Sequence, residues 1–157
     1  MEFPALRGRS ILVVEDELLI GMDIRSALEE AGAHVTSTTT VRHALMLAAD
    51  DGLAGAIMDH ALRDGDSTEL CARLTARGIP YVSYSGFDPV KGASPDAPFV
   101  SKPASMNTLL GVLENLLILS RPLSRSNPRS FRENNRKIHD FVIPASPTVQ
   151  RFGIGLV

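Results

Sequence analysis

"AGAIMDHALRDGD", residues 54–66, joins an apolar stretch directly to a charged residue. Ala56, Ile57 and Met58 are apolar, and Asp59 follows them with no turn residue between. A carboxylate at the end of a buried strand costs free energy unless a cation or hydrogen-bond donors accompany it. The stretch therefore predicts a buried strand and, beside Asp59, a group of opposite charge supplied by another part of the chain.

The segments on both sides of this strand alternate between strand and helix patterns. Ile20, Ile24 and Leu28 recur with the spacing of one helix face, and Gly32 follows where a C-terminal cap belongs. The predicted strands cover residues 11–14, 33–38, 53–58, 79–84 and 97–101, and the predicted helices cover 17–31, 41–51, 67–77 and 105–119. Continuous apolar strands separated by helices indicate an α/β fold, a doubly wound five-stranded parallel sheet with helices on both faces.

One segment departs from this alternation. Residues 86–98, GFDPVKGASPDAP, follow the strand at 79–84, where a fourth helix is expected. Three prolines and two glycines in this segment oppose a regular helix. We therefore expect the fourth helix to be short or absent. The preceding helix, in contrast, has Asp66 or Ser67 in place to cap its N-terminus.

Chemically reactive side chains follow several of the predicted strands. The carboxyl ends of parallel strands meet at one edge of such a sheet, where ligands bind. The residues expected at this edge are Glu15, Asp16, Glu17, Asp59, Ser83, Ser85 and Lys102. Clustered carboxylates repel one another unless a cation intervenes, and oxygen ligands without His or Cys favour Mg²⁺. Together with an ammonium and a hydroxyl, this set describes a site that accepts a phosphoryl group.

Four motifs in order give the chain a resemblance to the receiver domains of response regulators, over about residues 8–120. ILVVEDE (11–17) is similar to the family's first strand with its acidic pair, and Asp59 matches the phosphoacceptor. Ser85-Gly86 matches the Ser/Thr followed by a small residue, and Lys102-Pro103 matches the Lys-Pro with its usual cis bond. The resemblance implies the flavodoxin-like receiver fold and a two-component signalling switch. Such a switch is not an enzyme beyond its own phosphoryl transfer and dephosphorylation.

The resemblance also implies which side chains handle the phosphoryl group. Asp59 would carry it as an acyl phosphate, and Lys102 would pair with its oxygens. Ser85 would turn toward it, with Ser83 as the alternative on spacing alone. Phe99 matches the aromatic residue whose rotation reports phosphorylation in many receivers, and a core role explains it equally well.

The same resemblance implies a magnesium site. Asp16 and Asp59 would bind the ion directly and Glu15 through water, with the backbone carbonyl of Ala61 as a further ligand. Glu17 stands at the predicted start of a helix, where its negative charge interacts favourably with the N-terminal end of the helix dipole.

Residues 79–87, IPYVSYSGF, extend the resemblance to the FAT GUY subgroup of stand-alone receivers. A Phe-Ala-Thr-Gly-Tyr stretch of that subgroup corresponds to residues 83–87 here. This chain has Ser for Phe, Tyr for Ala, Ser for Thr and Phe for Tyr. The hydroxyl and the aromatic after the glycine are kept, and the shortened fourth-helix region is also similar to this subgroup.

Charge is divided unevenly along the chain. Residues 1–120 carry nine Lys/Arg against sixteen Asp/Glu, a net charge of −7, whereas residues 121–157 carry seven against two, a net charge of +5. Pro, Ser, Asn and Arg are scattered through the second segment, which is too short for a core of its own. We therefore expect 121–157 to be a basic, largely irregular C-terminal tail. Phosphate contacts by such a tail would lack sequence specificity, so a solvated arm is preferred over a nucleic-acid contact.

Cysteine content and hydropathy indicate the compartment. The single cysteine, Cys71, excludes an internal disulfide framework and is typical of a reducing environment. No apolar run approaches the ~20 residues that a bilayer requires. The first residues, MEFPALRGRS, lack the apolar stretch of a secretory signal. We expect a cytoplasmic protein with no membrane partner.

Two functions from different classes fit these observations. The first is a stand-alone response regulator in a phosphorelay. It would accept a phosphoryl group on Asp59 from a phosphohistidine of a sensor histidine kinase or a histidine phosphotransfer protein, and signal to a downstream protein by contact. The alternative is a receiver-like interaction module that works without phosphorylation and contacts nucleic acid through its basic tail.

The last predicted helix offers a surface for such contacts. Between residues 109 and 119, only Gly111, Glu114 and Asn115 are not apolar. A helix that is apolar nearly all round needs cover on more than its core face. A partner, a second copy in a homodimer, or the chain's own tail could supply that cover.

Overall fold

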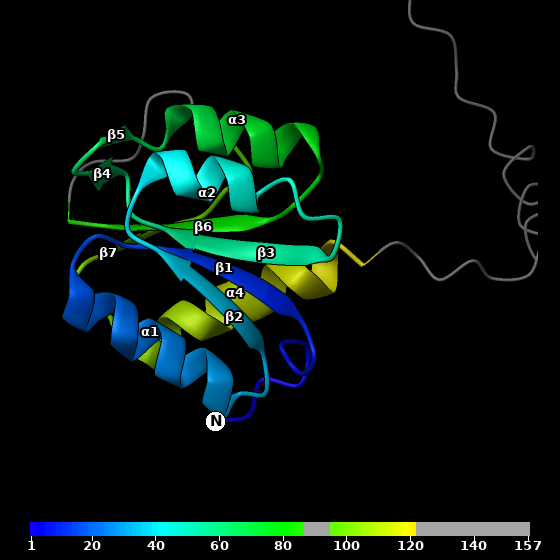
Figure 1. Cartoon of the computed structure of the whole chain (residues 1–157). Helices are drawn as coiled ribbons and strands as arrows, with labels where there is room; N and C mark the ends of the chain where they lie inside the picture. The colour runs from blue at the N-terminus through cyan, green and yellow to red at the C-terminus, as the bar shows by residue number, and fades with distance from the viewer. Residues whose placement is uncertain (87–94, 122–157) are drawn as a thin grey trace, which may run out of the picture. The chain divides into compact units, whose positions relative to one another are not determined.

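The centre of the fold is a five-stranded parallel sheet with the strand order β2-β1-β3-β6-β7 (Figure 1). It belongs to the compact unit Met1–Arg121 of a computed structural model that describes residues 1–86 and 95–121 of the chain. The strands are β1 (Ser10–Val14), β2 (His34–Thr38), β3 (Leu53–Met58), β6 (Tyr81–Ser85) and β7 (Phe99–Ser101). All neighbouring strands are parallel, so their carboxyl ends lie at the same edge, on the left in Figure 1.

Two helices cover each face of the sheet, and each pair closes its own apolar cluster. The helices are α1 (Leu18–Glu30), α2 (Val41–Leu47), α3 (Thr68–Ala76) and α4 (Met106–Leu119). Ile11 and Val13 of β1 are buried in the cluster beneath α1 and α4, whereas Leu12 and Val14 are buried beneath α2 and α3. Burial on both faces explains why this strand is an unbroken apolar run rather than an alternating one. The predicted doubly wound fold is confirmed.

The helix ends follow local signals in the sequence. Gly32 has a φ of +87° just after α1, a left-handed conformation that glycine adopts without strain. The Ser105 hydroxyl accepts a hydrogen bond from the Thr108 N–H at 3.1 Å and caps α4. At α3, Ser67 is the N-cap residue by position, but the Asp66 carboxylate accepts the hydrogen bond from the Thr68 N–H, at 2.9 Å.

Three details differ from, or lie outside, the sequence prediction. The fourth strand of the sheet in chain order, β6, covers 81–85 rather than 79–84, so Ser85 belongs to the strand. A two-stranded antiparallel hairpin, β4 (Ala61–Leu62) with β5 (Gly65–Asp66), follows β3 and was not predicted. The expectation of a short or absent helix concerns mostly residues 87–94, and that of an irregular tail concerns 122–157. Both ranges lie outside the described residues.

Three of the first seven residues, Phe3, Ala5 and Leu6, belong to the core, although the predicted domain begins at residue 8. Phe3 and Leu6 are buried in the cluster beneath α1 and α4. The Ala5 N–H donates to Glu114 Oε1 of α4 at 2.8 Å. This N-terminal segment therefore supplies part of the cover that the apolar helix α4 requires, leaving Ile118 and Leu119 as its exposed large apolar residues.

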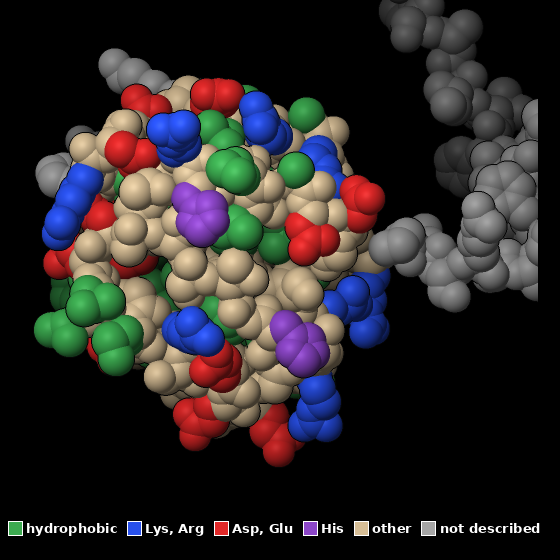
Figure 2. Space-filling view, viewed as in Figure 1, with side chains coloured by type: hydrophobic (Ala, Val, Ile, Leu, Met, Phe, Trp, Pro, Cys, Tyr) green, Lys and Arg blue, Asp and Glu red, His purple; other side chains and the backbone are tan. Residues whose placement is uncertain are grey.

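The face seen in Figure 2 carries both positive and negative side chains, and apolar side chains gather near the start of α1. Leu18, Leu19 and Met22 are exposed there, immediately after the strand end that carries Glu15. Among the residues that the structure describes, no helix combines the length and apolar character needed to cross a membrane.

Candidate functional site

The predicted site residues stand at the ends of four neighbouring strands, and backbone hydrogen bonds between strands fix their positions. Glu15 follows β1, Asp59 follows β3, Ser85 ends β6 and Lys102 follows β7. The Asp59 N–H donates to the Val14 carbonyl at 2.9 Å, and the Lys102 N–H donates to the Ser85 carbonyl at 2.9 Å. These hydrogen bonds continue the strand pairing one residue beyond the strand ends. They bring together side chains from distant parts of the sequence.

The Lys102 ammonium lies at the centre of the site. Its Nζ lies 2.7 Å from Glu15 Oε2 and 2.9 Å from Asp59 Oδ2, so it bridges the two carboxylates. Glu17 Oε1 lies further away, 3.7 Å from the same nitrogen. The side chains of Glu15 and Asp59 are only 2% and 7% exposed, and that of Lys102 is 12% exposed. Lys102 is the opposite charge that the carboxylate at the end of β3 requires.

Burial and ion pairing act together on the titration of these groups. Burial raises the pKa of Glu15, and the hydrogen bonds from Lys102 and from the Glu17 N–H oppose that rise only in part. Burial alone would lower the pKa of Lys102, but its hydrogen bonds to Glu15 and Asp59 outweigh burial and raise that pKa. Lys102 is therefore a fixed positive charge at neutral pH.

One oxygen of Asp59 is left without a partner. Oδ2 binds Lys102, whereas Oδ1 is buried and accepts no hydrogen bond within the described part of the chain. A buried, unpaired carboxylate oxygen is costly, and a metal ion or another electrophile would remove that cost. Ligand oxygens of Glu15, Glu17 and Asp59 lie within 4.8 Å of one another. Three carboxylates against one ammonium leave an excess of negative charge, which fits a hard divalent cation such as Mg²⁺.

Asp16, a predicted magnesium ligand, is not one of the three carboxylates of this cluster. The Asp16 carboxylate lies 3.8 Å from the Arg63 guanidinium, whose side chain is 84% exposed. Glu17, expected only to favour the helix dipole, takes the place in the cluster that was expected for Asp16. Ala61, whose carbonyl was expected to be a ligand, is the exposed first residue of β4.

The two candidate serines and the aromatic residue occupy neighbouring rungs of the sheet. Ser83 pairs in register with Phe99, and Ser85 pairs with Ser101. Both serines are buried, and Ser85, the last residue of its strand, is the one nearer to the carboxyl edge. Phe99 is half-buried at the start of β7.

The sequence patterns gave no role to Tyr84, which contacts the site, or to Asp64, which binds the start of α2. The ring of Tyr84 lies beneath Lys102, with the ammonium 5.4 Å from the ring centroid. Asp64, in the hairpin after Asp59, accepts hydrogen bonds from the N–H groups of Val41 and Arg42 at 2.9 and 3.1 Å. The sequence did contain a signal for Tyr84. Tyr84 adjoins Ser85 on β6 and pairs with Val100 on β7, two residues before Lys102, so it must lie close to Lys102.

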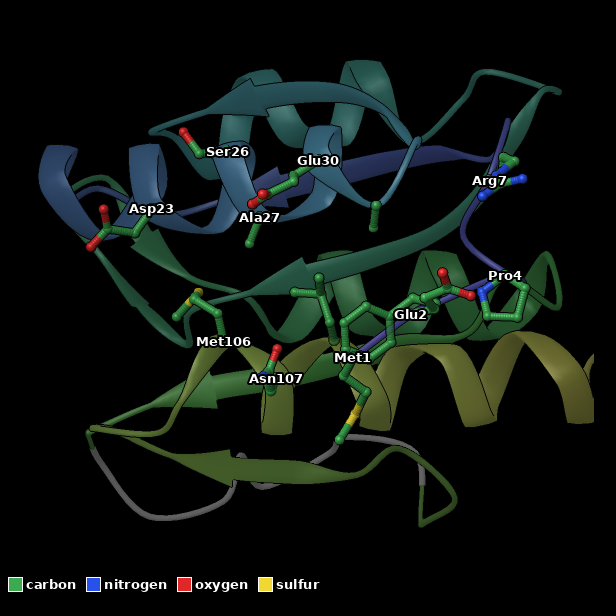
Figure 3. A pocket seen from close by; sticks show the side chains of 13 residues that line it. Met1, Glu2, Pro4, Arg7, Asp23, Ser26, Ala27, Glu30, Met106 and Asn107 are labelled. Atoms are coloured by element: carbon green, nitrogen blue, oxygen red, sulfur yellow. The ribbon is translucent and has the colours of Figure 1, made fainter.

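A cavity of about 620 Å³ lies elsewhere on the molecule, between α1, α4 and the N-terminal segment (Figure 3). Its lining includes Arg7, Asp23, Glu30 and Asn107 but none of the carboxylates around Lys102. The carboxyl edge of the sheet is therefore the better candidate for the chemistry, because the converging charges lie there.

Several solved structures to which this chain is similar are described as receiver domains. A response regulator receiver protein from Sinorhizobium medicae is 22% identical, with a TM-score of 0.68, over 74% of this chain and 99% of that chain. The non-phosphorylated HemR receiver domain from Leptospira biflexa is 24% identical, with a TM-score of 0.64, over 73% and 98%.

A third similar structure is described with a metal. It is the receiver domain of a sensor histidine kinase from Pseudomonas aeruginosa, with a magnesium ion coordinated in the active-site cleft. It is 21% identical, with a TM-score of 0.62, over 70% of this chain and 98% of that chain. No family model and no curated protein matches the sequence. At these identities the likeness establishes the fold, that of response-regulator receiver domains.

Proposed function

We propose that this chain is a stand-alone response regulator that accepts a phosphoryl group on Asp59. The observation that carries the proposal is the unequal environment of the two Asp59 oxygens. Lys102 holds Oδ2, and Oδ1 is buried without a partner. An oxygen with no hydrogen bond to break is ready to bind a metal or attack phosphorus.

The transfer follows from the charges at the site. An Asp59 oxygen attacks phosphorus, the bond from phosphorus to the histidine nitrogen of the donor breaks, and that nitrogen keeps the electron pair. Lys102 pairs with the phosphoryl oxygens, whose charge is spread and needs neutralisation more than covalent help. Ser85 turns toward the same oxygens. Asp59, Asp16 and the Ala61 carbonyl would hold a Mg²⁺ ion directly, and Glu15 would hold it through water; the ion would supply further neutralisation of charge.

The signal is a change of surface at the carboxyl edge. Phosphorylation adds about −1.5 to −2 charges and three acceptor oxygens. Lys102 and Ser85 shift toward these oxygens, and Phe99 moves with them, which shifts the population between two arrangements of the site. We assign the chain to the FAT GUY subgroup on residues 79–87, with a sensor histidine kinase or histidine phosphotransfer protein as donor. The receiver domain would cover 8–120, with 121–157 as its basic tail, in the cytoplasm.

The exposed end of α4 is the proposed contact for a downstream protein or a second copy. Ile118 and Leu119 are 51% and 81% exposed. Ile118→Glu with Leu119→Glu should weaken that contact, and analytical ultracentrifugation and partner binding would measure it. A monomeric wild type whose partner binding is untouched by the two substitutions would contradict this part of the proposal.

Phosphorylation itself is tested by intact-mass measurement after incubation with acetyl phosphate and Mg²⁺. Wild type should gain the mass of one phosphoryl group, and Asp59→Asn should gain none. Asp64→Asn is the matched control, because it removes a carboxylate five residues away that does not contact Lys102. A wild type that stays unmodified would favour the alternative, an interaction module that works without phosphorylation.

A further inference from the structure

Tyr84 is a buried residue of the site region that none of the steps above uses. It precedes Ser85 on β6 and is 4% exposed, with its ring in the apolar cluster beneath α1 and α4. Across the sheet it pairs with Val100 of β7, and the turn that carries Lys102 follows the end of that strand. A tyrosine placed here can act on the site through Lys102.

The ammonium of Lys102 lies over the ring of Tyr84. Lys102 Nζ lies 5.4 Å from the ring centroid, and its nearest carboxylate oxygens, on Glu15 and Asp59, lie at 2.7 and 2.9 Å. The face of an aromatic ring attracts a cation within about 6 Å, and the attraction grows when the pair is desolvated. Lys102 is 12% exposed, so water screens this contact little.

The hydroxyl of Tyr84 makes a second contact with the same turn. The Ala104 N–H donates to Tyr84 Oη at 3.3 Å. Ala104 is followed by Ser105, the N-cap of α4. One side chain therefore holds the turn between β7 and α4 at two points, the ammonium of Lys102 and the backbone of Ala104.

We propose that Tyr84 is a positioning residue for Lys102. The inference rests on the proposed phosphoryl transfer, in which the ammonium must leave the carboxylates and meet the phosphoryl oxygens. Lysine has a flexible stem, and a change of partners would otherwise release it into many rotamers. The ring of Tyr84 offers the ammonium an attraction that does not depend on which oxygens lie in front of it. The lysine therefore stays in the pocket throughout the transfer.

Separate removal of the ring and of the hydroxyl tests this role. The rate of phosphorylation by acetyl phosphate with Mg²⁺ should fall about tenfold in Tyr84→Leu, because the cation–π contact is lost. Tyr84→Phe keeps the ring and should stay within about twofold of wild type. Tyr81→Leu is the control, because it removes a buried ring from the same strand in the cluster on the opposite face. Equal slowing in Tyr84→Leu and Tyr81→Leu would overturn the proposal.

A substitution of similar size controls for the case in which Tyr84→Leu does not fold. Pentafluorophenylalanine at position 84 fills the same space, but its ring face no longer carries the negative charge that attracts a cation. Its phosphorylation should be as slow as that of Tyr84→Leu. A rate equal to that of Tyr84→Phe would overturn the proposal, because shape alone would then suffice.

A third measurement does not depend on phosphorylation. Competitive acetylation followed by peptide mass spectrometry reports the reactivity of the Lys102 amine. We expect slow labelling in wild type and Tyr84→Phe, and labelling several-fold faster in Tyr84→Leu. If wild type takes up no phosphoryl group but shows this labelling pattern, the proposed function fails and the positioning role stands. Unchanged labelling in Tyr84→Leu would overturn the positioning role itself.

Discussion

The site has two halves that differ in burial. The closed half consists of Glu15, Asp59 and Lys102, and the open half consists of Asp16, Glu17 and Arg63. In the closed half, hydrogen bonds of 2.7 and 2.9 Å join side chains that are at most 12% exposed. In the open half, the Asp16–Arg63 contact is 3.8 Å long, and the side chains of Glu17 and Arg63 are 63% and 84% exposed, whereas that of Asp16 is 16% exposed.

This difference separates the reacting group from the groups that adapt to it. A buried charge network has few alternative arrangements, because each partner would be left uncompensated if another moved. Exposed charges are hydrated and screened, so they change partners at little cost. The closed half therefore sets where Asp59 stands. The open half can rearrange when a cation binds, because the exposed Arg63 is easily exchanged by Asp16 for the cation over a contact of 3.8 Å.

The largest expected effect comes from removal of the cation of the closed half. Lys102→Met leaves Glu15 and Asp59 buried without an opposite charge, which should lower the free energy of unfolding by about 3 kcal/mol. Arg63→Met removes the cation of the open half and should change the free energy of unfolding by less than about 0.5 kcal/mol. Urea unfolding of both variants measures the contrast. Equal losses of unfolding free energy in Lys102→Met and Arg63→Met would contradict the difference between the two halves.

Magnesium should partly repair the closed half. In Lys102→Met, a divalent ion can take over the neutralisation of Glu15 and Asp59, so added Mg²⁺ should raise the midpoint of unfolding more in this variant than in wild type. The same titration of Arg63→Met serves as its control. If Mg²⁺ leaves the midpoint of unfolding of Lys102→Met unchanged, the cluster does not hold the ion.

A smaller effect distinguishes the two acidic residues of the open half. We expect Asp16→Asn to weaken magnesium binding about tenfold and Glu17→Gln about threefold, because a direct ligand contributes more than a nearby exposed charge. Isothermal titration with Mg²⁺ at constant ionic strength measures both. A larger loss for Glu17→Gln would mean that the cluster of Glu15, Glu17 and Asp59 is itself the ligand set.

The smallest expected effect concerns the hairpin beside the open half. Hydrogen bonds from the Val41 and Arg42 N–H groups lower the pKa of Asp64 below its ordinary value of 3.8. Its contribution to stability is therefore complete above that value and is lost as the pH falls through the lowered pKa. Asp64→Ala should lower the melting temperature at neutral pH, and the difference from wild type should narrow in acid. Asp23→Ala, which replaces an exposed carboxylate of α1, is the control. A difference between Asp64→Ala and wild type that stays constant with pH would contradict this role.

The closed half was readable from the sequence, and the open half was not. Glu15, Asp59 and Lys102 each follow an apolar run, and a parallel sheet brings its strand ends together whatever the loops do. The orientation of Asp16 depends on Arg63 and on a hairpin whose strands are two residues each, too short for any periodic pattern. Local exposed charges leave no signal of which partner they choose.

The N-terminal segment and Tyr84 were missed for different reasons. Phe3 and Leu6 lie in a stretch without helix or strand periodicity, so nothing marked them as core. Tyr84 was noted only as a departure from a family motif. Its contact with Lys102 follows from the register between β6 and β7 and not from a pattern within either strand.

The account depends on Asp59 as the acceptor, and chemical mapping tests this most directly. Protein treated with acetyl phosphate and Mg²⁺ would be reduced with borohydride, which converts an aspartyl phosphate to homoserine, and then digested and sequenced by mass spectrometry. We expect homoserine at position 59 and at no other aspartate, with none in Asp59→Asn. Homoserine at Asp16 or Asp64 instead, or at no position, would contradict the account.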